Sequence, residues 1–115
     1  MLNMNEHELK LATEPFEAIV LGNKTIESRL FDHKRQQIKL GDTITFTNRE
    51  SPNQTLSVRV VGLLRYQTFE DLFVNNDTQK FGGPNNEWLL NQIHEFYSLA
   101  DEKVNGVIGI EFELL

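Results

Sequence analysis

The chain has 115 residues, of which 39% are hydrophobic, 24% charged and 10% aromatic, a composition typical of one soluble domain spanning residues 1–115. It contains no cysteine, which excludes disulfides, thiolate zinc sites, Fe–S clusters and a cysteine nucleophile. No apolar run is long enough to cross a membrane, and residues 1–10 lack the basic and apolar blocks of a secretory signal, so we expect a cytoplasmic protein.

The charge is distributed unevenly along the chain. Eleven basic and 17 acidic residues give a formal net charge of −6, which argues against non-specific binding to duplex nucleic acid. Residues 24–39, however, contain five basic and two acidic residues, a local net charge of +3. This segment is either a solvated basic surface or a segment that guides a negatively charged ligand.

The first third of the chain predicts a strand, a helix and a second strand. Residues 7–11 alternate polar and apolar side chains, which is typical of a short half-buried strand. We expect Thr13 to cap the following helix and Gly22 to end it. The alternation resumes over residues 24–30, which predicts a strand with one apolar and one polar face.

The middle of the chain predicts a loop and a hairpin. Residues 31–37 are polar and favour a loop. Residues 43–47 and 56–64 both alternate, and the polar segment between them indicates a turn, so the two strands form a hairpin. Gly62, inside the second strand, predicts a bulge or a bend.

The last third predicts two helices and a final strand. Thr68 can cap a short helix, and residues 75–86 are polar and glycine-rich enough to form a mobile loop. A longer helix is expected from Glu87, with a buried stripe formed by residues at helical spacing, namely Leu89, Ile93, Phe96 and Ala100. Residues 106–115 alternate again and predict a strand with one face in water.

About five strands and three short helices without regular βαβ repetition indicate an α+β fold that is mainly β. We expect a small curved or barrel-like sheet with helices covering its ends, rather than a doubly wound parallel sheet.

The most unusual cluster of polar residues lies between Gly22 and Arg29. Glu27 and Arg29 fall on one strand face, and Lys24 lies at the strand entrance on the opposite face. Together they offer donors for a phosphate or a base carbonyl and an acceptor for an exocyclic amine or a ribose hydroxyl. The alternative is a surface Glu–Arg pair with a solvated lysine.

This pattern, G-x-K-T-x-E-x-R, resembles the signature of the ASCH domain family, which belongs to the PUA-like superfamily. Other segments are similar to the family in order and spacing: PFEAIVLG, the Gly41-Asp42 turn with ITFTN, YQTFEDLF, Tyr97 and GVIGI. The resemblance implies a PUA-like pseudo-barrel. It also implies a cleft, lined by the lysine, glutamate and arginine of the signature, that suits RNA or a nucleotide.

The leading functional prediction is therefore binding of single-stranded RNA, or of a nucleotide or nucleoside. The expected ligand-binding residues are Lys24, Thr25, Glu27, Arg29, Lys34, Arg35 and Tyr97. We expect no cofactor and no metal, because the three histidines are scattered without ligand spacing.

Two alternatives remain open. One branch of the family hydrolyses the amide of N4-acetylcytidine with a lysine of this motif, a threonine three residues later and a separate glutamate, which this sequence does not assign to a position. Lys24 matches that lysine, but Glu27 stands at the threonine position, and a carboxylate could serve as a catalytic base only if its pKa were raised. The second alternative is a non-catalytic scaffold for protein interactions.

Overall fold

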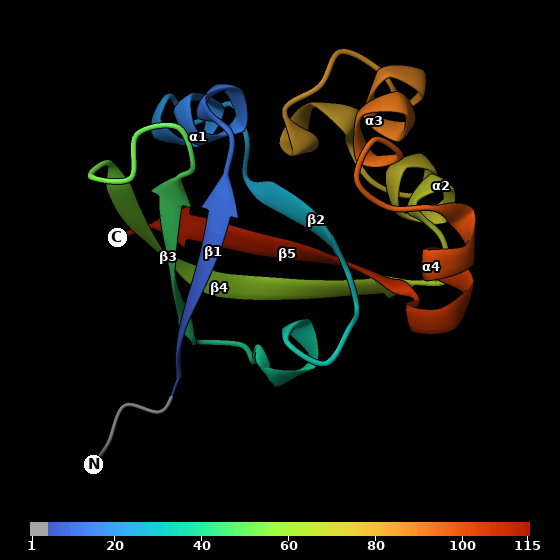
Figure 1. The fold of residues 1–115 in the computed structure, drawn as a ribbon, viewed down its shortest axis with the longest axis horizontal. Coiled ribbons are helices and arrows are strands. Elements are labelled where there is room, and N and C mark those ends of the chain that lie inside the picture. Colours follow the sequence, from blue (N-terminus) through green and yellow to red (C-terminus); the bar gives the residue numbers. More distant parts are fainter. Residues whose placement is uncertain (1–4) are drawn as a thin grey trace.

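The computed structural model describes residues 5–115, which form a curled five-stranded sheet with helices at its ends (Figure 1). The strands are β1 (Glu6–Leu11), β2 (Ile26–Leu30), β3 (Thr43–Asn48), β4 (Thr55–Tyr66) and β5 (Val107–Leu114). The helices are α1 (Thr13–Val20), α2 (Phe69–Val74), α3 (Asn86–Ile93) and α4 (Leu99–Asn105), with 3₁₀ turns η1 (Arg35–Gln37) and η2 (Thr78–Phe81).

The strand order is β1-β3-β4-β5-β2, with β1 parallel to β3 and every other pair antiparallel. The sheet curls without closing, so β1 and β2 are its two edges. Arg29 of β2 spans part of this opening, because its Nη2 atom donates to the Lys10 carbonyl oxygen of β1 at 2.7 Å. This arrangement confirms the prediction of a mainly β fold built on a curved sheet.

Two apolar cores lie on opposite sides of β5. The first packs α1 against β1, β3 and β4 and includes Ile108 and Ile110 of β5. The second packs α2, η2 and α3 against β2 and includes Val107. Because alternate residues of β5 enter different cores, most of β5 is covered on both faces. The predicted wet face is therefore wrong at Gly109, which is buried against Leu72 and Ile26.

The predicted helix from residue 87 to residue 100 is wrong, because two helices replace it. The chain turns after Ile93, and Ser98 begins α4 with a capping box in which Asp101 returns the hydrogen bond. Phe96 lies in the connection and is 62% exposed, and Ala100 is also exposed, so neither joins the buried stripe. The connection instead brings Tyr97 beside β2.

Other boundaries move by smaller amounts. Thr13 is the first helical residue rather than the cap, and its hydroxyl bonds the Asn48 side chain. Strand β2 begins at Ile26 rather than at residue 24, because the Thr25 N–H donates to the Lys80 carbonyl oxygen instead of pairing within the sheet.

Several local predictions are confirmed. The β3–β4 hairpin forms, and the register of the β4–β5 ladder shifts next to Gly62, as a bulge requires. Thr68 caps α2 through the Asp71 N–H, and Gly22 adopts a positive φ of 81° after α1. Within residues 5–115, no helix is long and apolar enough to span a bilayer.

Candidate functional site

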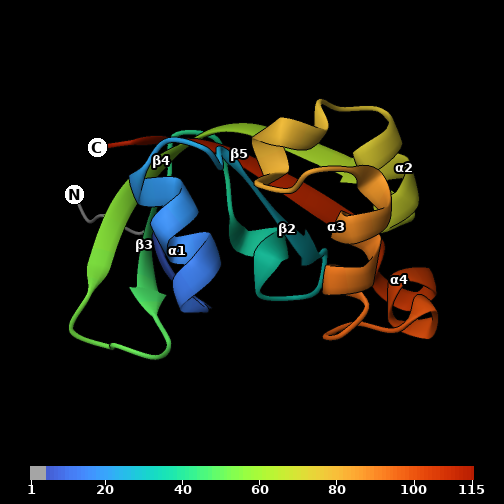
Figure 2. The same ribbon diagram turned by 90° about the horizontal axis from the view of Figure 1, so that it is seen from above.

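A cleft of about 420 Å³ opens at the free edge of the sheet. Figure 2 shows α1 and α3 on either side of β2, and the cleft lies between them, with β2 at its floor. Its lining comes from the β1–α1 corner, β2, η2, α3 and the connection to α4. The segments that meet here are more than 80 residues apart in the chain, so the cleft depends on the complete fold.

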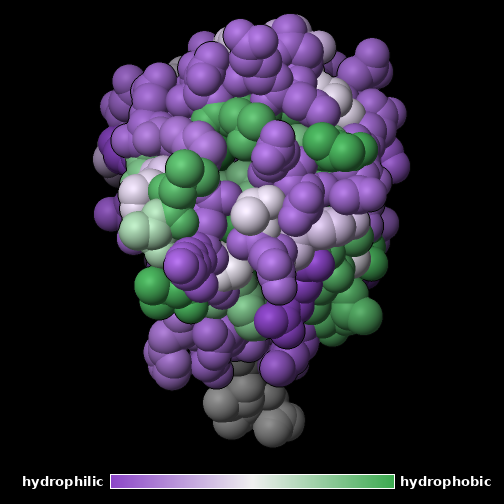
Figure 3. All heavy atoms as spheres, turned by 90° about the vertical axis from the view of Figure 1, so that its right-hand side faces the viewer, coloured by the Kyte–Doolittle hydropathy of each residue, from purple (hydrophilic) through white to green (hydrophobic). Residues whose placement is uncertain are grey.

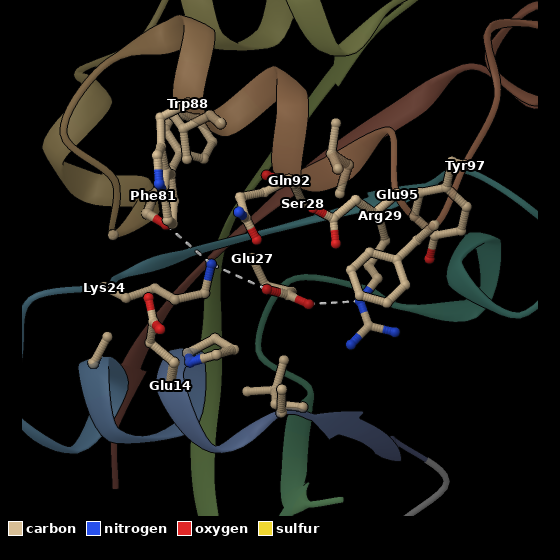
Figure 4. Close-up of a pocket in the computed structure, with 18 of the residues that line it drawn as sticks. Glu14, Lys24, Glu27, Ser28, Arg29, Phe81, Trp88, Gln92, Glu95 and Tyr97 are labelled. Atoms are coloured by element: carbon tan, nitrogen blue, oxygen red, sulfur yellow. Dashed lines mark hydrogen bonds and ion pairs between the residues drawn. The ribbon is translucent and has the colours of Figure 1, made fainter.

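The Lys24 ammonium group lies at one end of the cleft floor (Figure 4). Its Nζ atom donates to the carbonyl oxygens of Ile26 and Phe81 at 3.0 and 3.2 Å, and it lies 3.1 Å from Glu27 Oε1. An ammonium group has three donor hydrogens, so these partners occupy all of them. Lys24 therefore connects the strand entrance to η2 and has no free donor for a ligand.

The Glu27 carboxylate occupies the centre of this row. Its Oε1 atom faces Lys24, and its Oε2 atom accepts from Arg29 Nε at 2.6 Å. Glu27 is only 6% exposed, and burial alone would raise its pKa, but the charges of Lys24 and Arg29 outweigh that effect and hold the pKa below its usual value. Glu27 is therefore ionised, and each oxygen keeps a second lone pair that can accept a hydrogen bond.

Arg29 completes the row of charges. Burial opposes its ionisation, but the neighbouring Glu27 carboxylate and the Tyr97 hydroxyl raise the pKa of Arg29 above its usual value. Tyr97 is fixed in turn by stacking on Phe69, with ring centroids 5.9 Å apart and planes 14° apart. The guanidinium is thus a cation held in place by two hydrogen bonds, from Nε to Glu27 and from Nη2 to the Lys10 carbonyl oxygen.

The remaining lining combines aliphatic, aromatic and polar side chains. Trp88 and Phe81 lie at the Lys24 end of the cleft, and Gln92 extends from α3 toward the Lys24–Glu27 pair (Figure 4). The charged lining residues number four basic and three acidic, a net charge of +1: Lys10, Lys24, Arg29 and Arg49 against Glu14, Glu27 and Glu95. The cleft is therefore mildly positive in a protein whose overall charge is −6.

A family model for the ASCH domain matches residues 9–115. The chain belongs to the ASCH domain family. The resemblance seen in the sequence is thereby confirmed, and with it the expectation of a PUA-like fold.

Solved structures share the fold of this chain. The crystal structure of the hypothetical protein PH0355 is 34% identical over 96% of this chain and 99% of that one, with a TM-score of 0.85. The solution structure of PF0455 from Pyrococcus furiosus is 36% identical over 96% and 97%, with a TM-score of 0.75. A mutant form of ZmASCH from Zymomonas mobilis is 13% identical over 98% and 70%, with a TM-score of 0.71, which shows the fold alone. No match was found among curated proteins.

The ASCH domain brings four of the seven predicted site residues into its cleft, namely Lys24, Glu27, Arg29 and Tyr97. Lys24 and Glu27 are buried and the Arg29 side chain is only 13% exposed, so the alternative of a solvated surface pair is wrong. Lys24 joins Glu27 because its backbone lies in the turn before β2, from which the long side chain reaches back over the strand.

The other three predicted residues lie outside the cleft lining. Thr25 is exposed and borders a shallow depression beside Lys80. Arg35 pairs with Asp32 at 2.7 Å in the η1 turn, and Lys34 is exposed next to it. A role for this basic segment in guiding phosphate stays a prediction.

Sequence reasoning did not single out several residues of the cleft. Gln92, Ser28, Lys10 and Arg49 belong to this group. Lys10 and Arg49 reach the cleft through the pairing of β1 with β3, and Gln92 reaches it through the packing of α3 beside β2, so no local motif marks them. Ser28 stands at an unspecified position of the signature.

The geometry bears on the hydrolase alternative. A base that activates water needs a raised pKa, and the pKa of Glu27 is lowered by its two cationic neighbours. Two of the histidines are also engaged with carboxylates, His7 with Asp42 and His94 with Glu102, each at 2.8 Å. In residues 5–115, no group of three or more metal-ligating side chains is assembled.

Proposed function

We propose that this ASCH domain binds an unpaired base of single-stranded RNA, or a free nucleoside or nucleotide, in the cleft beside β2. The observation that carries the proposal is the row of Lys24, Glu27 and Arg29 on the floor of a cleft with aromatic residues in its walls. Family membership supports the same class of ligand.

The size and charge of the cleft fit such a ligand. A volume of about 420 Å³ lies in the range of small-molecule sites. Trp88 offers a ring on which a base can stack, which is the usual way in which proteins hold unpaired bases. The overall charge of −6 opposes a long duplex, while the mildly positive cleft accepts one nucleotide.

The polar groups divide the recognition between them. Glu27 can accept from an exocyclic amine or a ribose hydroxyl, and Arg29 can donate to a carbonyl or a phosphate. Lys10 and Arg49 are exposed lining residues, suited to contact the phosphates that precede or follow the bound base. Lys24 has the separate role of holding Glu27 ionised and in place.

The alternative of an interaction scaffold has less support. On the face formed by α2, α3 and α4, apolar side chains form separate small patches among hydrophilic ones (Figure 3). Partner-binding surfaces are more often continuous apolar patches of several hundred Å².

The test uses Gln92, because the charged row is buried and its variants would lose stability for reasons unrelated to binding. Gln92 is exposed and lines the cleft, and its side chain has no hydrogen-bond partner in residues 5–115. Calorimetric titration with the four ribonucleosides and with a single-stranded 10-mer should show binding that weakens about tenfold in Gln92→Ala. Gln67→Ala, an exposed glutamine outside the cleft, is the matched control and should bind normally. Absence of binding to every probe would reject the proposal.

A further inference from the structure

The free edge of β2 presents unpaired backbone groups. β2 pairs with β5 without a register shift. Two hydrogen bonds continue this ladder beyond the ends of β2: the Phe112 N–H donates to the Thr25 carbonyl oxygen, and the Phe31 N–H donates to the Gly106 carbonyl oxygen. In an antiparallel ladder, residues that bond the partner strand alternate with residues that do not. The backbone groups of residues 26, 28 and 30 therefore point away from β5.

Of these three residues, Ser28 lines the cleft in the part of the chain that the structure describes. Ser28 is only 8% exposed, and its N–H and its carbonyl find no hydrogen-bond partner in residues 5–115. Buried backbone groups are nearly always paired, because leaving one unpaired costs about 1–3 kcal/mol. The arrangement therefore favours a ligand that supplies the missing partners.

The part of the β2 edge that stays open to a ligand is one residue long and consists of Ser28. On one side of Ser28, the Ile26 carbonyl is already bonded to Lys24 Nζ. On the other side, the Arg29 side chain crosses from β2 to the Lys10 carbonyl of β1. An added peptide strand needs alternate residues along the edge, so these two contacts block strand addition and leave room for a small planar group.

We infer that the base of the bound nucleotide hydrogen-bonds the Ser28 N–H and carbonyl through an adjacent acceptor and donor on its Watson–Crick edge. The inference rests on the proposed function and deepens it. In this geometry, the N–H and the carbonyl of one extended residue form two hydrogen bonds with the same partner, as those of a hydrogen-bonded residue do in an antiparallel ladder. Gln92 lies above the same part of the floor and can bond a further group of the base (Figure 4).

This arrangement predicts that the cleft selects bases whose Watson–Crick edge is accessible. Each standard base carries a donor next to an acceptor on this edge, and base pairing uses both. The cleft should therefore accept unpaired bases and reject paired ones. It should equally reject bases whose edge donor is replaced by methyl groups, because the Ser28 carbonyl then loses its partner.

Four matched pairs of nucleosides test the inference with the full-length protein. They are uridine and N3-methyluridine, cytidine and N4,N4-dimethylcytidine, adenosine and N6,N6-dimethyladenosine, and guanosine and 1-methylguanosine. For the nucleoside that binds most tightly, the methylated partner should bind at least about tenfold more weakly, which corresponds to about 1.4 kcal/mol. Amide NMR spectra of the ¹⁵N-labelled protein should show the Ser28 N–H shifting downfield on binding, with exchange slowed about tenfold.

Two variants of Ser28 distinguish the contribution of its backbone groups to binding from that of its side chain. Ser28→Pro removes the N–H donor at an edge position where the β5 ladder does not use it, and it should weaken binding about tenfold. Ser28→Ala keeps the backbone N–H and carbonyl, so it should lose much less affinity than Ser28→Pro does. An unmoved Ser28 amide in a protein that binds nucleosides would overturn the inference and leave the proposed function intact. Failure of every nucleoside and of the 10-mer to bind would overturn both.

Discussion

The Lys24 ammonium and the Glu27 carboxylate lie 3.1 Å apart, and each side chain is less than a tenth exposed. With Arg29, they form a charged row that is part of the fold as much as of the cleft. Charged side chains are rarely buried without close partners of opposite charge, and here the carboxylate lies between two cations. The residues that define the candidate site are therefore also the residues whose replacement endangers folding.

Lys24→Met should destabilise the protein by about 3–5 kcal/mol, because it leaves a buried carboxylate with one cation fewer and two carbonyls without a donor. Urea unfolding followed by tryptophan fluorescence measures this difference. Lys34→Met, which replaces an exposed lysine, should change stability by less than about 0.5 kcal/mol. Equal effects of the two changes would contradict the buried row.

Glu27 should make stability depend on acid pH. Its pKa is lowered by Lys24 and Arg29 after burial is overcome, so the folded state binds the proton less readily than the unfolded state does. The stabilisation is complete above the ordinary value of 4.5 and is lost as the pH falls through the lower folded value. Urea midpoints between pH 3 and pH 6 should therefore fall more steeply in the wild type than in Glu27→Gln. Parallel curves would show that Glu27 is not held in this way.

Gly82 should tolerate alanine less well than Gly22 does. Both have a positive φ, 84° and 81°, at which a side chain costs about 1–2 kcal/mol. A Cβ at Gly82 would also lie 3.2 Å from the Cβ of Lys24, whereas Gly22 has open space. Gly82→Ala should cost about 1 kcal/mol more than Gly22→Ala in thermal or urea unfolding. Equal losses would mean that η2 can move away from Lys24.

Binding of a single-stranded 10-mer should depend on salt through the cations that line the cleft. If Lys10, Arg29 and Arg49 each neutralise one phosphate, log K should fall with log salt at a slope of about −2. Arg49→Ala should reduce the slope to about −1.4. Arg59→Ala, an exposed arginine outside the cleft, should leave it unchanged. Nucleosides carry no phosphate, and their binding should vary little with salt.

Local patterns in the sequence predicted much of the fold. Alternation located five strands, glycine marked the end of α1 and the bulge of β4, and Thr68 marked the start of α2. The helical pattern failed where a second local signal, the Ser98–Asp101 capping box, competes with it. Helical spacing continued through Phe96 to Ala100, but the Ser98 capping box began a new helix and left both residues exposed.

The candidate site was only partly predictable, because contacts between distant parts of the chain place its residues. Glu27 and Arg29 share a strand face by simple parity, but the position of Lys24 depends on the Phe81 carbonyl, 57 residues later in the chain. The edge position of β2, which frees the Ser28 backbone, follows from the order of the strands. That order depends on how distant segments pair, which local spacing does not encode.

The most direct test of the account is an NMR map of the ¹⁵N-labelled protein titrated with the nucleoside that binds most tightly. The account predicts that the largest shifts fall on the cleft, at the Ser28 amide, the Gln92 side-chain amide and the Trp88 indole N–H. Shifts centred on the η1 segment around Lys34 and Arg35, with the cleft unchanged, would contradict it.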